Sequence, residues 1–85
     1  IDQALPMYLR ALQLREEVLG PQHPQVATSC NNLGTLYLDH GQVDQAEELL
    51  NRALSIWTQS LLADHPDIAR VKRNLQRLYS KRSSS

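Results

Sequence analysis

The chain repeats itself with a fixed spacing. Segments from its first half return 42 positions later, in the same order and without an insertion. The recurring pairs are Asp2-Gln3-Ala4 with Asp44-Gln45-Ala46, Arg10-Ala11-Leu12 with Arg52-Ala53-Leu54, His23-Pro24 with His65-Pro66, Asn32-Leu33 with Asn74-Leu75, and Leu36-Tyr37 with Leu78-Tyr79. A period in this range is typical of stacked repeat proteins, whose units bury their apolar faces only against one another. Such proteins usually present a surface to a partner and perform no chemistry.

Length and charge are consistent with one small repeat segment. The 85 residues allow a single domain with a modest core, which we place at 1–82, followed by a polar tail at 83–85. The formal net charge of zero favours neither a nucleic-acid binder nor a membrane-surface protein. No apolar run reaches membrane-spanning length, and the single Cys30 cannot form an internal disulfide. The sequence therefore predicts a protein of the reducing cytoplasm with no membrane partner.

Four helices separated by short breaks are predicted, and no segment shows the pattern of a strand. The first covers about 3–19 and the second about 24–39, while the third begins near Val43 and the fourth at Pro66. Gly-Pro and His-Gly dipeptides end the first two helices. Short connections imply antiparallel neighbours. The expected fold is therefore all-α, with antiparallel helix hairpins stacked as a solenoid.

Small and apolar side chains predict how these helices pack. Gly34, Ala46 and Ala53 lie where bulk would push helix axes apart. Cys30 is expected in the core as a small hydrophobic residue. Trp57 is expected either to pack on the lengthened helix or to be half-exposed as a contact residue. The apolar residues at helical spacing on the first helix are Ala4, Met7, Tyr8, Ala11, Leu12, Leu14, Val18 and Leu19.

The helix starts carry recognisable capping residues. Asp44 followed by Glu47 is a candidate capping box for the third helix. Asp64 or His65 is the candidate cap of the fourth. His23 and His65 both precede a proline at a helix start, and no further metal ligands stand at suitable spacing. We therefore expect both histidines to have a structural role in the loops.

These residues resemble the tetratricopeptide repeat. With Ala27 as the first position of a unit, the residues on that family's signature positions are Leu33, Gly34, Tyr37, Gly41, Ala46 and Ala53. Cys30 replaces the family's usual Trp, Val43 replaces the usual aromatic residue, and the closing Pro is missing because the second helix and its loop are longer. The segments 19–27 and 31–37 are similar to the 42-residue variant found in kinesin light chains and nephrocystin-type scaffolds.

In this frame the chain holds half a unit, a whole unit and half a unit. Helical repeats usually need about three units for independent stability. We therefore expect a piece of a longer array, or its C-terminal end. Its apolar edges would bind neighbouring repeat units or a second copy of the chain.

The resemblance implies that the first helix of each unit lines a groove for a peptide segment. The implied groove positions are Thr28, Asn31, Asn32, Thr35 and Asp39 in the whole unit, and Arg70, Arg73, Asn74, Arg77 and Lys81 in the last half-unit. The second set shares one helix face and is basic, whereas the acids cluster near the central turn. These acids are Asp39, Asp44, Glu47 and Glu48. Asparagines could bond a peptide backbone and arginines its carboxylates. Alternatively, the basic face is a solvated cap and the asparagines bridge neighbouring helices.

Two functions are consistent with these patterns. The first is an adaptor or scaffold module that binds an acidic peptide segment of a partner protein. The alternative is a structural, self-assembling or capping segment of a larger array, with no ligand of its own. Neither requires a cofactor or a metal, and an enzyme is not expected, since there is no phosphate-binding glycine loop and no base near Cys30 in the sequence. Nucleic acid is disfavoured because the basic stripe lacks interleaved aromatic residues.

Overall fold

The chain folds into four helices, and the all-α prediction is confirmed. The computed structural model describes residues 4–60 and 65–83, and these ranges contain no strand. The helices are α1 (Ala4–Leu19), α2 (Pro24–Asp39), α3 (Val43–Ser60) and α4 (Pro66–Ser83). Each begins within one residue of the start expected from the sequence. Helix α4 also includes Ser83, which the sequence analysis assigned to the polar tail.

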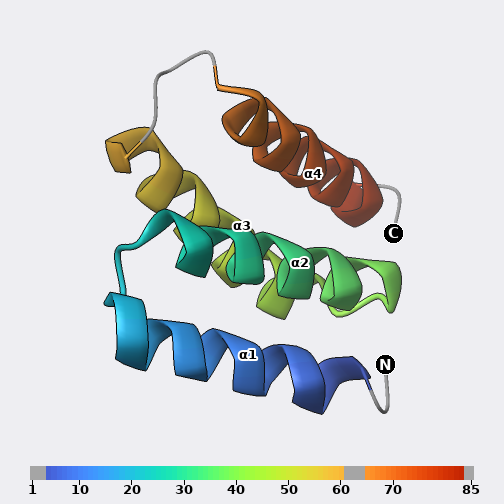
Figure 1. Ribbon diagram of the computed structural model, residues 1–85. Coiled ribbons are helices and arrows are strands. Elements are labelled where there is room, and N and C mark those ends of the chain that lie inside the picture. The colour runs from blue at the N-terminus through green and yellow to red at the C-terminus, as the bar shows by residue number, and fades with distance from the viewer. Residues whose placement is uncertain (1–3, 61–64, 84–85) are drawn as a thin grey trace.

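Helix α2 lies at the centre of the arrangement. It contacts α1, α3 and α4, and Figure 1 shows it between α1 and α4 with consecutive helices antiparallel. The Cα positions extend over 38 × 33 × 16 Å. The shortest dimension accommodates two layers of helices at their usual separation of about 8–10 Å. The hairpins are therefore stacked in a flat array, which makes α2 and α4 neighbours.

The two histidine–proline dipeptides start α2 and α4 in the same way. The Nδ1 atom of His23 accepts a hydrogen bond from the backbone N–H of Gln25 at 3.1 Å, and Nδ1 of His65 accepts one from Asp67 at 3.1 Å. Each bond satisfies one of the N–H groups that lack a partner in the first turn. The structural role predicted for both histidines is confirmed. Asp64, the other candidate cap, lies outside the described residues.

The centre of the core is the contact between α2 and α3. A Cβ atom on Gly34 would lie only 2.9 Å from Cγ of Leu50. The two helices can therefore approach this closely only because residue 34 has no side chain. Ala46 and Ala53 of α3 are fully buried, as expected of small residues at a close helix contact. Cys30 is also fully buried, and this burial raises the pKa of its thiol.

Trp57 is a core residue, which decides between the two roles considered for it. Its side chain is 1% exposed, and its indole N–H donates to the backbone oxygen of Pro24 at 3.2 Å. Arg15, its counterpart one repeat earlier, donates to the backbone oxygen of Gln25 at 3.1 Å. Equivalent residues of α1 and α3 therefore hold the first turn of α2 from two sides.

The apolar face of α1 is mostly exposed. Met7 and Val18 are 73% and 79% exposed, and Leu12 is the buried residue of this helix. Helix α1 packs on α2 through the side that contains Leu12 and the partly buried Leu5. The other apolar side chains of α1 lie away from this contact, so their spacing predicted the helix but not its burial.

The predicted capping box of α3 is not formed. The helix begins at Val43, so Asp44 lies inside its first turn and not in front of it. Glu47 instead accepts a hydrogen bond from Arg82 of α4 at 3.1 Å. Both acids still lie near the positive end of the helix dipole, where they are favourable.

Candidate functional site

Helices α2 and α4 are neighbours, and side-chain contacts join their C-terminal halves. Nδ2 of Asn74 donates to Oδ1 of Asn31 at 3.0 Å. Nζ of Lys81 donates to the backbone oxygen of Leu38 at 2.8 Å. Arg77 forms an ion pair with Asp39. These contacts fix which side of α4 adjoins which side of α2.

The residues beside these contacts form one surface, which we call the α2/α4 face. Its members are Thr28, Asn32, Thr35 and Asp39 from α2, and Arg70, Arg73, Arg77 and Lys81 from α4. Within each helix they are spaced by three or four residues, so they share a side of that helix. All are exposed except Thr35, which is half-buried. The structure thus brings eight of the ten sequence-predicted groove positions together on one side of the molecule.

Asn31 and Asn74 have a different environment from the rest of the predicted site. Asn31 is 4% exposed, and its side chain accepts the bond from Asn74 in the contact between the two helices. The sequence had placed Asn74 in correspondence with Asn32, one position further along. Asn74 therefore takes the bridging role that was the alternative for it, whereas Asn32 remains exposed.

The polar side chains of α2 differ in whether they form hydrogen bonds within the helix. Oγ1 of Thr35 donates to the backbone oxygen of Asn32 at 2.8 Å, and Oγ1 of Thr28 donates to that of Pro24 at 3.3 Å. Each hydroxyl keeps its acceptor lone pairs for a ligand. The side-chain amide of Asn32 has no protein partner within the described residues, so both its donor and acceptor groups face solvent.

The basic and acidic clusters, which the sequence analysis treated as separate, meet in the structure. Arg77 pairs with Asp39, and Arg82 pairs with Asp44 and with Glu47, both at 3.1 Å. The end of α4 therefore adjoins the turn between α2 and α3 and neutralises its acids. The pairing of these acids with the arginines of α4 was not predicted from the sequence. It follows once α2 and α4 are neighbours, because the C-terminal ends of the two helices then lie close together.

The first half of α4 keeps more of its positive charge. Arg70 lies 3.7 Å from Asp67 on the same helix, and its side chain is 61% exposed. Arg73 has no ion-pair partner among the described residues. The unneutralised charge of the α2/α4 face is therefore concentrated near Arg73, on the same side as the free amide of Asn32.

Other kinds of site find less support in the described part of the chain. No three His, Cys, Asp or Glu side chains there come together as metal ligands would. None of the four helices has the length and apolar content needed to cross a bilayer. The arrangement offers polar and basic contacts on a helical surface.

Stacked antiparallel hairpins with recurring caps define an α-helical repeat protein. The family model of the tetratricopeptide repeat matches the chain twice, over residues 1–59 and 31–84. The two matches overlap and together cover nearly the whole sequence, and the chain belongs to the tetratricopeptide repeat family. Repeats of this family are typically protein–protein interaction domains. A search of curated proteins found no significant match.

Proposed function

We propose that this chain is a peptide-binding adaptor module, and that the α2/α4 face receives an extended acidic segment of a partner protein. The observation that carries the proposal is that two neighbouring helices contribute polar and basic groups to one surface. Asn32 and Arg73 have no side-chain partner there within the described residues. An asparagine in a helix interior costs helix stability, and a ligand contact gives a reason for its presence.

The chemistry of the face suits an extended acidic peptide. The Asn32 amide can donate to and accept from a peptide backbone. The guanidinium groups of Arg70 and Arg73 can bind carboxylates in a bidentate manner. Because these groups are exposed, each ion pair contributes only about 0.2–1 kcal/mol and is screened by salt. We therefore expect weak binding that decreases as the salt concentration rises.

Arg77 reaches a ligand only in competition with Asp39. Breaking an exposed ion pair costs about 1 kcal/mol or less, so a ligand carboxylate can replace the carboxylate of Asp39. Substituting Asp39→Asn removes both the competitor and a repulsive charge. We expect this variant to bind an acidic peptide several-fold more tightly than the unaltered chain.

The test is a titration of a fluorescent glutamate-rich peptide, with a glutamine-rich peptide as the uncharged comparison, at low and at physiological salt. Arg73→Glu should weaken binding of the acidic peptide roughly tenfold, because an attraction is replaced by a comparable repulsion. Lys72→Glu is the matched control: it changes net charge equally, but its side chain lies about 100° around the helix. Equal losses in the two variants would show that only net charge matters and would refute a site at the α2/α4 face.

A further inference from the structure

The bridge between α2 and α4 uses only part of the Asn74 amide. Its Nδ2 atom donates to Oδ1 of Asn31 at 3.0 Å. A side-chain amide also carries an oxygen that accepts hydrogen bonds, and the oxygen of Asn74 takes no part in this contact. Asn74 is half-buried, whereas Asn31 is 4% exposed. Asn74 is therefore the member of the pair that can contact a ligand, and it would do so through Oδ1.

Asn31 restricts the orientation of the Asn74 amide. A buried acceptor without a donor costs free energy, and within the described residues no buried side-chain nitrogen or oxygen lacks a hydrogen-bond partner. Turning the Asn74 amide over would exchange its nitrogen and its oxygen and place two oxygens against each other. The bridge therefore holds the nitrogen of Asn74 towards α2, and its oxygen at the other corner of the planar amide.

The charges around Asn74 favour the same orientation. Arg70 and Arg77 stand four residues before and three residues after it on α4, so they share its side of the helix. Arg73 precedes it directly. Beside these guanidinium groups the partially negative oxygen of an amide is more favourable than its N–H groups. The opposite bridge, in which Asn31 donates to Asn74, would leave the N–H groups of Asn74 among the positive charges.

We propose that Asn31 is a positioning residue of the α2/α4 face, and that it holds the Asn74 amide so that Oδ1 accepts one backbone N–H of the bound peptide. The inference rests on the peptide-binding function proposed above. Asn32 has no such constraint, because its exposed amide has no protein partner within the described residues and can turn to donate or to accept. The face therefore requires an N–H group at one ligand residue, the one that lies over Asn74.

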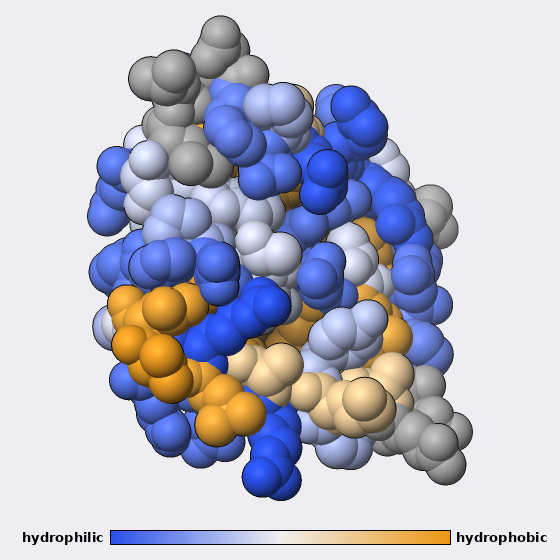
Figure 2. All heavy atoms as spheres, in the orientation of Figure 1, coloured by the Kyte–Doolittle hydropathy of each residue, from blue (hydrophilic) through white to orange (hydrophobic). Residues whose placement is uncertain are grey.

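The polar surroundings of this contact determine which change of the ligand has the larger effect. Figure 2 shows a hydrophobic band over α1, the lowest helix in that orientation, and mostly hydrophilic surface above it. At such a surface water can replace a lost hydrogen bond, so the loss alone has a small effect. A ligand oxygen placed against Oδ1 of Asn74 instead opposes two acceptors and leaves both without a donor. Exchanging the N–H for an oxygen is therefore the sensitive test.

A scan with ester-containing peptides tests the contact. The probe is a fluorescent peptide with two glutamates separated by one uncharged residue, in an otherwise uncharged sequence, so that the glutamates fix its position on the arginines. Each member of the scan has one backbone N–H replaced by an ester oxygen. With the unaltered chain, one ester position should weaken binding about tenfold, and the others less than about threefold. Equal effects at all positions would refute a fixed acceptor.

Variants of Asn31 separate positioning from packing, with circular dichroism confirming that each one folds. Asn31→Ala lets the Asn74 amide turn, so the sensitive ester position should lose most of its effect, to about twofold. Asn31→Asp keeps an acceptor for Nδ2 of Asn74 and should restore the effect. An undiminished effect in Asn31→Ala would refute positioning, while binding by the unaltered chain would still support the proposed function. If no acidic peptide binds the unaltered chain, both are refuted.

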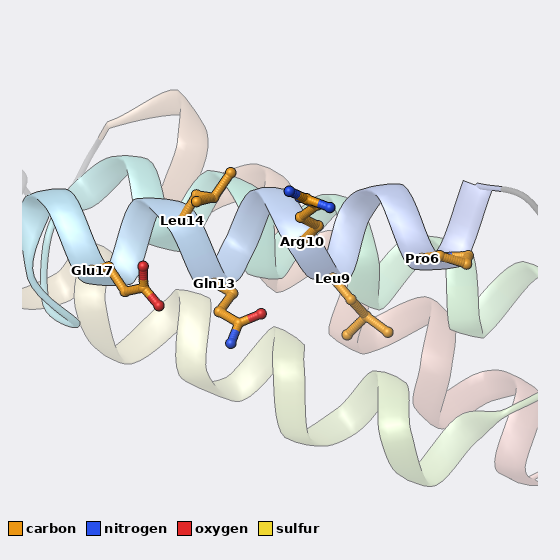
Figure 3. A pocket seen from close by; sticks show the side chains of 6 residues that line it. All are labelled: Pro6, Leu9, Arg10, Gln13, Leu14 and Glu17. Carbon is orange, nitrogen blue, oxygen red and sulfur yellow. The ribbon is translucent and has the colours of Figure 1, made fainter.

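Two other amides serve as matched controls. Asn32→Ala removes an amide of the same face without touching the bridge, so it should weaken binding of every peptide alike and leave the sensitive ester position unchanged. Gln13 of α1 carries the same amide group and lies between Leu9 and Glu17 on the surface of that helix (Figure 3). Gln13→Ala should change neither the affinity nor the ester pattern. A shift of the sensitive position in either variant would contradict the assignment to Asn74.

The bridge itself can be observed without a ligand by nuclear magnetic resonance. The side-chain amide protons of Asn74 should exchange with water more slowly than those of the exposed Asn32, because Nδ2 of Asn74 donates to Asn31. Asn31→Ala should remove this difference. Equal exchange of the two amides in the unaltered chain, or a difference that survives in Asn31→Ala, would overturn the proposal.

Discussion

The close approach of α2 and α3 at Gly34 leads to a prediction in which a substitution changes sign with its background. In the unaltered chain, Gly34→Ala places a Cβ atom 2.9 Å from Cγ and Cδ2 of Leu50, which is fully buried. Overpacking of this kind costs about 1–3 kcal/mol. Replacing a helical glycine by alanine returns about 1 kcal/mol in helix propensity. We expect a net loss of up to about 2 kcal/mol in the free energy of unfolding.

In a Leu50→Ala background the atoms that clash are absent. Leu50→Ala by itself should cost about 2–5 kcal/mol, because it leaves a cavity. Adding Gly34→Ala should then raise the free energy of unfolding by about 1 kcal/mol, since the propensity gain remains and the nearest other atom, the backbone oxygen of Ala46, lies 3.4 Å away at ordinary contact distance. The coupling between the two sites should be about 1–3 kcal/mol.

The assay is urea unfolding followed by circular dichroism, with all four chains measured in the same concentration of trimethylamine N-oxide so that the weakest one stays folded. Gly41→Ala serves as the matched control. Gly41 has a φ of 79° and nothing within 4 Å of an added Cβ, so its substitution introduces backbone strain but no clash. It should destabilise both backgrounds equally. If Gly34→Ala also did so, close packing against Leu50 would not be the reason for glycine at this position.

Three further predictions concern single side chains. His23→Ala should cost about 1 kcal/mol of stability in thermal or urea unfolding, whereas His23→Asn should keep most of it, because asparagine can also cap α2. Trp57 should emit at short wavelength in the folded chain and shift to longer wavelength on unfolding; Trp57→Phe, which loses the bond to Pro24, should cost about 1 kcal/mol or more. Burial raises the pKa of Cys30 and so favours its neutral thiol; relative to Cys30→Ala, the chain should therefore lose stability as pH rises above the value of the unfolded thiol, about 8.5, and an alkylating reagent should modify it only after opening.

The helices were predictable because their ends carry local signals. A proline with a preceding histidine marks the start of α2 and of α4, and Gly41 takes the left-handed conformation after α2. Such signals act between residues that are close in the sequence, so they can be recognised without knowing the tertiary structure. The small residue at Gly34 likewise predicted a close helix contact without identifying Leu50 as its neighbour.

The details of the candidate site depend on contacts between distant residues, and these were only partly predictable. The period placed Asn32 and Asn74 in equivalent positions, but the bridge forms between Asn74 and Asn31, which are 43 residues apart. The equivalence of two positions in a repeat does not determine which residue of one helix contacts the neighbouring helix. The pairing of Arg77 with Asp39 has the same origin. The basic residues of the last helix suggested an open basic face, and the fold brings acids beside it that neutralise part of its charge.

The central position of α2 has a consequence for how this chain loses its structure. Helix α2 packs against α1 and most extensively against α3, and α3 in turn packs against α4. In a long array, terminal units can fray independently of the rest. Here, melting α2 would leave α1 and α3 without their main contact, and α4 packs chiefly on α3, so heat or urea should remove all four helices in one cooperative transition. A shorter folded fragment would have to retain the contact between α2 and α3.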